Sequence, residues 1–108
     1  MKVWLASQSL RRAAMLQPFF PDLKCEGFTD VDETPSPGSV EVQVLSICQK
    51  KSIAVPDEHG FDMVIVCDTL LADPDDMDST LGKPNDTVEA AMMLHRLSGR
   101  RHQVWSAT

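Results

Sequence analysis

The sequence predicts an α/β fold in one domain spanning residues 1–108. Short apolar segments alternate with segments of helical periodicity along the chain, which is the pattern of a layered α/β protein. One apolar run, from Met63 to Val66, is continuous, as expected for a strand that is covered on both faces. Each predicted helix also follows a serine or aspartate, the residues preferred at a helix N-cap. The predicted order of elements is β-α-β-α-β-β-β-α-β.

Helical spacing and turn residues divide the first half of the chain into five segments. Ser7 or Ser9 caps the first helix and Ser39 caps the second. Pro18 stops the first helix, and Pro56 stops the second, since proline cannot continue a helix. The segments are a strand over residues 3–6, a helix over 10–17, a strand over 24–28, a loop over 30–38 that contains Pro35, and a helix over 39–55.

The second half supplies the remaining strands and one helix. Asp86 is the predicted N-cap of that helix, Glu89 is its capping-box partner three residues later, and Ser98-Gly99 ends it. The acidic residues 73–79 are interpreted as a solvated turn between two short strands. The segments are a strand over 61–67, a hairpin with strands over 70–72 and 80–81, a helix ending near Leu97, and a strand over 102–107.

Composition and charge exclude several classes of protein. The net charge of -6 lacks the basic footprint of a nucleic-acid-binding protein, so we expect no nucleic-acid partner. No apolar run approaches the roughly 18 residues of a membrane span, so we expect no membrane partner. The three cysteines are odd in number and form no paired motif, which argues against a disulfide framework or zinc site and indicates the cytoplasm.

The junction after the first strand has the features of a phosphate site. Ser7 and Ser9 place hydroxyls and free backbone N–H groups at the start of a helix, where anions are favoured. Arg11 and Arg12 follow in the first turn, and a guanidinium group can bind two phosphate oxygens at once. The alternative interpretation is an ordinary serine cap followed by solvated arginines.

Two acidic positions are candidates for metal binding or proton transfer. Asp68 follows the apolar run, at the end of a strand where open α/β sheets place their ligands. A carboxylate there can hold Mg²⁺ or accept a proton from water. Glu33 lies beside Asp32 on the proline-containing loop. The alternatives are an aspartate that caps a turn and a solvated acidic pair.

Two lysines could neutralise a polyphosphate near these groups. Lys83 lies between Gly82 and Pro84, in a constrained turn, while Lys51 lies on the second predicted helix. A surface lysine is the ordinary expectation for each of them alone. Their occurrence with a strand-end carboxylate and a phosphate cradle in one short chain favours polyphosphate chemistry.

At these residues the chain resembles the Maf family of nucleoside triphosphate pyrophosphatases. The resemblance runs from Val3 to the end of the chain and rests on several motifs in compatible order. These motifs are Leu5-Ala6-Ser7-Gln8-Ser9-Leu10-Arg11-Arg12, Asp32-Glu33-Thr34, Lys51-Ser52-Ile53-Ala54-Val55, Asp68-Thr69, Leu81-Gly82-Lys83-Pro84 and Leu97-Ser98-Gly99.

The resemblance implies hydrolysis of a nucleoside triphosphate to its monophosphate and pyrophosphate, with Mg²⁺ or Mn²⁺ as the cation. It implies a mixed sheet flanked by helices, related to the inosine triphosphate pyrophosphatases, with a cleft between two lobes. Asp68 and Glu33 would serve the metal and the attacking water, with Asp68 as the general base. The residues implied in substrate binding are Ser7, Ser9, Arg11, Arg12, Lys51, Thr69 and Lys83.

The paired arginines and the Asp68-Thr69 pair resemble the branch of the family that acts on dTTP and UTP. Family members continue for nearly as long again, so the second lobe is expected to be truncated, and the chain is either a fragment or a short relative. A strand near the end of the chain would leave an open edge, which predicts a homodimer. The alternative function is a non-catalytic nucleotide-binding or interaction module derived from a Maf protein.

Overall fold

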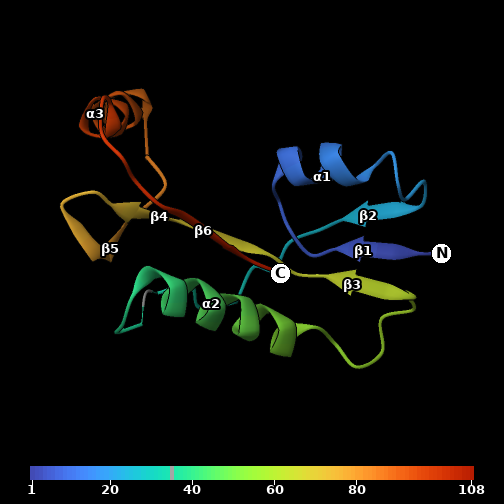
Figure 1. Cartoon of the computed structure of the whole chain (residues 1–108). Helices are drawn as coiled ribbons and strands as arrows, with labels where there is room; N and C mark the ends of the chain where they lie inside the picture. Colours follow the sequence, from blue (N-terminus) through green and yellow to red (C-terminus); the bar gives the residue numbers. More distant parts are fainter. Residues whose placement is uncertain (35) are drawn as a thin grey trace.

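The computed structural model describes residues 1–34 and 36–108, so the part of the predicted loop at Pro35 lies outside the described residues. The predicted order of elements is confirmed, and so is the α/β class. The strands form two separate three-stranded sheets (Figure 1). The elements are β1 (Val3–Leu5), α1 (Leu10–Leu16), β2 (Leu23–Cys25), α2 (Val40–Ala54), β3 (Met63–Ile65), β4 (Asp68–Asp73), β5 (Asp76–Leu81), α3 (Thr87–Leu97) and β6 (Val104–Ala107).

The first sheet is parallel, in the order β2-β1-β3. Its central strand is the most deeply buried, because Val3 and Leu5 of β1 are both fully inaccessible to solvent. Parallel neighbours require a crossover connection, and α1 supplies the one from β1 to β2. Helix α1 lies along one side of this sheet (Figure 1). The short strand β1 therefore delivers the chain directly to the start of α1.

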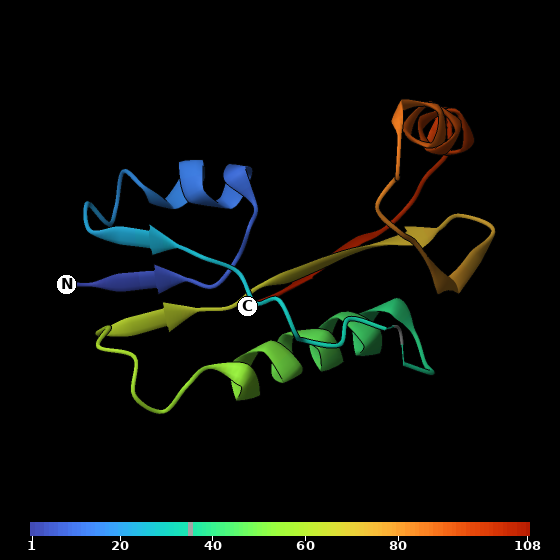
Figure 2. The same ribbon diagram turned by 180° about the vertical axis from the view of Figure 1, so that it is seen from behind.

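The second sheet is antiparallel, in the order β5-β4-β6, and it packs against α2. Apolar side chains spaced along α2, namely Val40, Val44 and Ile47, are almost fully buried in this contact. Figure 2 shows α2 running beneath the long strands β4 and β6. The chain passes from the first sheet to the second through Val66 and Cys67, between β3 and β4. The two sheets thus meet at a two-residue connection.

The helix ends agree closely with the predicted signals. Ser9, Ser39 and Asp86 are the three N-caps, and each side chain accepts a hydrogen bond from a backbone N–H of the first turn. Glu89 departs from the predicted capping box, because its carboxylate accepts from the backbone N–H of Asn85 at 2.6 Å and not from that of Asp86. Gly99 follows α3 with φ of 70°, the left-handed conformation that commonly ends a helix.

The predicted turn over residues 73–79 is shorter than expected, although residues 75–79 are exposed as predicted. Strand β4 continues to Asp73 and β5 begins at Asp76, so the turn itself is only Pro74 and Asp75. Asp73 is buried, and its carboxylate pairs with Arg96 of α3 at 2.8 Å. The acidic segment is structured because α3 brings cations to it, and this contact joins residues more than 20 positions apart.

Several strand bounds also differ from the prediction. The second strand is Leu23–Cys25 instead of 24–28, and the third is Met63–Ile65 instead of 61–67. Asp68 consequently opens β4 and does not end the preceding strand. No described helix is long and apolar enough to cross a membrane. The molecule is elongated, with principal extents of 44 × 29 × 22 Å, and α3 stands at one end (Figure 2).

Candidate functional site

A cleft of about 700 Å³ lies where the two sheets meet. Its walls come from the strand-to-helix junction after β1, the loop after β2, helix α2, the start of β4 and the turn after β5. All nine residues that the sequence singles out line this one cleft. They are Ser7, Ser9, Arg11, Arg12, Glu33, Lys51, Asp68, Thr69 and Lys83.

The first wall is built by the turn that leads into α1. The Ser9 hydroxyl caps the helix by accepting from the backbone N–H of Arg12 at 3.3 Å. Ser7 is buried, and its hydroxyl accepts from the backbone N–H of Ser9 at 3.1 Å and from Arg12 Nη1 at 3.0 Å. The two serines therefore have separate tasks: Ser9 begins the helix, while Ser7 orients the guanidinium group.

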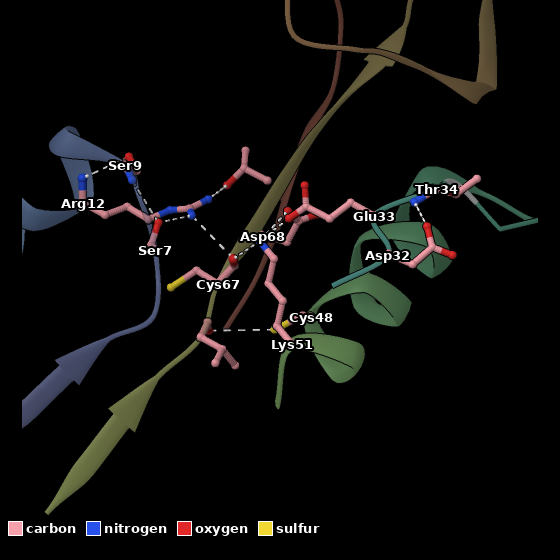
Figure 3. Close-up of polar contacts among 12 residues, drawn as sticks. Ser7, Ser9, Arg12, Asp32, Glu33, Thr34, Cys48, Lys51, Cys67 and Asp68 are labelled. Carbon is pink, nitrogen blue, oxygen red and sulfur yellow. Dashed lines mark hydrogen bonds and ion pairs between the residues drawn. The ribbon is translucent and has the colours of Figure 1, made fainter. Parts of the chain in front are cut away.

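Arg12 reaches across from α1 to the second sheet. Its Nη2 donates to Thr69 Oγ1 at 3.2 Å, and its Nη1 lies 3.5 Å from the backbone oxygen of Cys67. Thr69 Oγ1 also lies 2.9 Å from Ser106 Oγ on β6. Figure 3 shows the guanidinium group extended from α1 toward β4. A planar group held at both nitrogens in this way is set to receive a phosphate oxygen.

Lys51 occupies the centre of the opposite wall. Although it lies in the last turn of α2, where a surface lysine was the ordinary expectation, it is only 9% exposed. Its Nζ lies 2.9 Å from Glu33 Oε1 and 3.3 Å from Asp68 Oδ1, and it donates to the backbone oxygen of Cys67 at 3.1 Å. One ammonium group thus joins the two predicted acidic residues, which are far apart in the sequence.

Asp68 has one carboxylate oxygen committed and one free. Oδ1 faces Lys51, whereas the buried Oδ2 has no hydrogen-bond partner among the described residues. An unpartnered buried carboxylate oxygen is costly, so it indicates a position meant for a ligand atom, a cation or a water. The residue that carries this oxygen lines the cleft.

The loop after β2 holds the second carboxylate near the first. Asp32 is exposed, and its pKa is lowered by hydrogen bonds from the side chain and the backbone N–H of Thr34. This local turn leaves the neighbouring Glu33 to face Lys51, with half of its side chain still open to solvent. Asp32 therefore shapes the loop, while Glu33 reaches the cleft (Figure 3).

The carboxylates were also predicted to hold a cation. Among the residues that the structure describes, no group of three or more His, Cys, Asp or Glu side chains could hold a metal ion. Magnesium, however, is often bound through one or two carboxylates, with substrate phosphates and waters completing its ligands. Asp68 with its free oxygen and Glu33 nearby fit a cation that arrives with a polyphosphate.

Arg11 and Lys83 complete the charge around the cleft. Both are exposed at its rim, whereas Arg12 and Lys51 lie deeper. Four cationic side chains thus face a space that also contains two carboxylates. In a protein of net charge -6, this local excess of positive charge favours a small, highly charged anion.

Two contributors to the site escaped the sequence analysis. The backbone oxygen of Cys67 accepts from both Arg12 and Lys51, and no side-chain pattern reveals such a role. Ser106 pairs with Thr69 in the β4–β6 register, a contact between residues 37 positions apart. Burial raises the pKa of the nearby Cys48 thiol, and no described cysteine forms a disulfide.

Comparison with known proteins identifies the family of the chain. The family described as Maf-like protein matches residues 2–108. The chain is 35% identical over 100 residues to a dTTP/UTP pyrophosphatase of Pyrococcus abyssi, covering 93% of this chain and 51% of the relative. It is 38% identical over 104 residues to one of Myxococcus xanthus, covering 94% and 50%. A third, from Nitratidesulfovibrio vulgaris, is 39% identical over 107 residues, covering 96% and 49%.

The chain thus spans about half the length of the curated relatives it matches. The match itself includes every element of the structure from β1 to β6 and every residue of the cleft. The fold, the gathered residues and the family match together identify the chain as a member of the Maf family.

Proposed function

We propose that this chain binds a nucleoside triphosphate of the dTTP/UTP type and hydrolyses it to the monophosphate and pyrophosphate. The observation that carries the proposal is the convergence of four cations and two carboxylates on one cleft, with a carboxylate oxygen left unpartnered. The matched relatives are named dTTP/UTP pyrophosphatases, which supports this choice of substrate.

The triphosphate binds along the cationic side of the cleft. Arg12, held by Ser7 and Thr69, contacts phosphate oxygens with its guanidinium group. Arg11 and Lys83 at the rim neutralise the outer phosphates. Catalysis of phosphoryl transfer depends mainly on such positioning and charge stabilisation.

Asp68 acts on the attacking water. Its Oδ2 accepts a proton from a water molecule while the oxygen of that water bonds to phosphorus and the bridging bond between the α- and β-phosphates breaks. Lys51 orients the carboxylate through Oδ1, which leaves Oδ2 free for the proton. Pyrophosphate then leaves the cleft past the exposed lysine at the rim.

Mg²⁺ or Mn²⁺ is the proposed cofactor, held by Asp68 and Glu33. When bound, it would neutralise charge on the phosphates and lower the pKa of a bound water. The carboxylates are already brought together by Lys51, so the acidic pair is arranged before any ligand arrives. The proposed cellular location is the cytoplasm, in keeping with the unpaired cysteines.

A homodimer is also proposed. Strand β6 lies at an edge of the second sheet, and α3 exposes Val88, Met92 and Leu94. Open edges and apolar faces of this kind favour association with another chain. Light scattering after size exclusion tests it directly, because a single species with the mass of one chain at high concentration contradicts the dimer.

The activity is tested by pyrophosphate release from dTTP and UTP with Mg²⁺, detected as phosphate after addition of inorganic pyrophosphatase. Asp68→Asn should lower the rate by about 10²–10⁴-fold, the usual contribution of a general base, while nucleotide binding stays measurable. Asp57→Asn, at an exposed aspartate outside the cleft, is the matched control and should retain full activity.

The outcomes separate the candidate functions. Full pyrophosphate release by Asp68→Asn removes Asp68 from the catalytic role. A wild-type chain that binds the nucleotide without releasing pyrophosphate supports the alternative, a non-catalytic binding module.

A further inference from the structure

We propose that the Lys51 ammonium group occupies the cation position between Glu33 and Asp68 in the nucleotide-free chain, so that a metal ion enters only together with the polyphosphate. The proposal rests on the proposed function, because it assumes that these carboxylates hold the cation of a nucleoside triphosphate. It adds an order of binding, in which Lys51 first neutralises the acidic pair and then contacts the phosphates.

The surroundings of the Lys51 Nζ atom are those of a bound cation. Three oxygens surround it, namely Glu33 Oε1 at 2.9 Å, Asp68 Oδ1 at 3.3 Å and the backbone oxygen of Cys67 at 3.1 Å. Carboxylate and carbonyl oxygens are also the ligands of hard divalent cations. The Lys51 side chain is only 11% exposed and extends from α2 toward the two carboxylates (Figure 3). A metal ion that bound the same facing oxygens would have to take the place of Nζ.

The charges at this position both attract and repel a second cation. One ammonium group facing two carboxylates leaves one negative charge, and Asp68 Oδ2 is buried without a partner among the described residues. The guanidinium group of Arg12 is engaged with hydroxyl and carbonyl oxygens instead. A lone metal ion is thus drawn to Oδ2, but the nearby ammonium group repels it because the two charges have the same sign. The acidic pair therefore has a low affinity for a metal ion alone.

Glu33 is the part of this arrangement that can be released. Its side chain is 52% exposed on the loop after β2, so its ion pair with Lys51 is screened by solvent, whereas the Asp68 side chain is 12% exposed. A polyphosphate offers Lys51 another anion in exchange for Glu33, which frees Oε1 for the cation that arrives with the polyphosphate. The backbone oxygen of Cys67 keeps Arg12 as a donor when Lys51 turns away. Binding of metal and polyphosphate is thereby coupled through one side chain.

Manganese binding to the full chain, measured by electron paramagnetic resonance, tests this order because bound Mn²⁺ loses the signal of the free ion. Without nucleotide, Lys51→Met should bind Mn²⁺ about tenfold more tightly than the wild type, within the usual range of coupling between two sites. For the complex of Mn²⁺ with inorganic tripolyphosphate the sign reverses, and Lys51→Met should bind it about fivefold more weakly. Asp68→Asn measures the Mn²⁺ bound elsewhere on this acidic chain, and that amount is subtracted.

Lys83→Met is the matched control. Lys83 also lines the cleft but is exposed at its rim, so this variant loses the same charge without emptying the position between the carboxylates. Because solvent and salt screen an exposed charge, Lys83→Met should leave the affinity for Mn²⁺ alone within about twofold.

A measurement on the wild type decides the question if circular dichroism shows that Lys51→Met does not fold. The nitrogen NMR signal of the Lys51 ammonium group is identified by its absence from Lys51→Arg, which keeps a cation at this position. The signal should shift when the complex of Mg²⁺ with tripolyphosphate binds. A signal that the bound complex leaves unchanged overturns the proposal, because Lys51 then stays with the carboxylates.

The remaining outcomes separate this proposal from the proposed function. Equal Mn²⁺ affinities of wild type and Lys51→Met overturn the proposal, and so does a gain that Lys83→Met matches, since overall charge then explains it. Tighter binding of the tripolyphosphate complex by Lys51→Met overturns the step in which Lys51 turns to the phosphates. Failure of the wild type to bind that complex overturns the proposed function itself.

Discussion

Replacing Lys51 with methionine tests whether the buried ammonium group holds the acidic side of the cleft together. Methionine keeps most of the length of the side chain and removes the charge. Lys51 loses its contacts with Asp68 and Glu33 and with the backbone oxygen of Cys67. The Glu33 contact contributes little, because its side chain is 52% exposed and its charge is screened.

The cost is therefore dominated by Asp68, whose side chain is only 12% exposed. Removing one partner of a buried ion pair leaves an uncompensated charge and typically costs about 3–5 kcal/mol. The contact of 3.3 Å is long, so we expect the lower end, about 3 kcal/mol. For a domain of this size, that loss lowers Tm by about 12–24 °C.

Urea denaturation followed by circular dichroism measures the effect in a double-mutant cycle. In an Asp68→Asn background, Lys51→Met should cost only about 1 kcal/mol, because no buried charge is left unpaired. Lys50→Met, the same substitution one residue earlier on α2, is the control and should change stability by less than about 0.5 kcal/mol. Costs for Lys51→Met that agree within about 0.5 kcal/mol in the two backgrounds refute the role assigned to the pair.

Two further predictions concern the acidic turn and the mouth of the cleft. The pKa of Asp75 is lowered chiefly by its contact with Arg100, so its contribution to stability is complete above its ordinary pKa of 3.8 and is lost as pH falls through the lowered pKa. The difference in urea midpoint between wild type and Asp75→Asn should therefore be constant above pH 3.8 and shrink as pH falls below it, and a difference that stays constant at lower pH contradicts the prediction. Gly27→Ala would place a methyl group 2.6 Å from Gln8 Cγ, which forces Gln8 to move and should lower the free energy of unfolding by about 1 kcal/mol. Gly82→Ala, with open space around it, should lower the free energy of unfolding less, and calorimetric melting compares the two variants.

The local signals of the chain were sufficient for the order of its elements. Ser39 and Asp86 start helices where the cap rule places them, and Gly99 follows the last one in the expected conformation. These features depend on residues within one helical turn of each other. The strand ends were predicted less accurately. Ile65 and Cys67 are both apolar, but only Ile65 is part of a strand that pairs with a neighbour.

The site shows the same division between local and distant information. The sequence indicated that Ser9, Arg12 and Asp68 suit polyphosphate chemistry, and the structure brings them to one cleft. It could not indicate that Lys51 is buried between two carboxylates, since the loop, α2 and β4 meet only in the folded chain. Their catalytic and binding roles stay predictions until the variants are measured.

The structured acidic turn was missed for a related reason. Asp73 is interpreted as solvated when only its acidic neighbours are considered, and its partner Arg96 lies 23 residues later. Charge density in a segment predicts exposure only where no distant cation is folded against it. Here α3 supplies that cation, and the resulting ion pair between Arg96 and Asp73 also attaches the helix to the second sheet.

The carbonyl oxygen of Cys67 lies in the two-residue connection between the sheets. It accepts hydrogen bonds from Arg12 of α1 and from Lys51 of α2. The same two side chains line the cleft, so the contacts that tie both helices to the connection between the sheets are made by groups that also face the proposed ligand. A ligand that draws either side chain toward itself therefore removes a hydrogen bond that ties a helix to the connection between the two sheets.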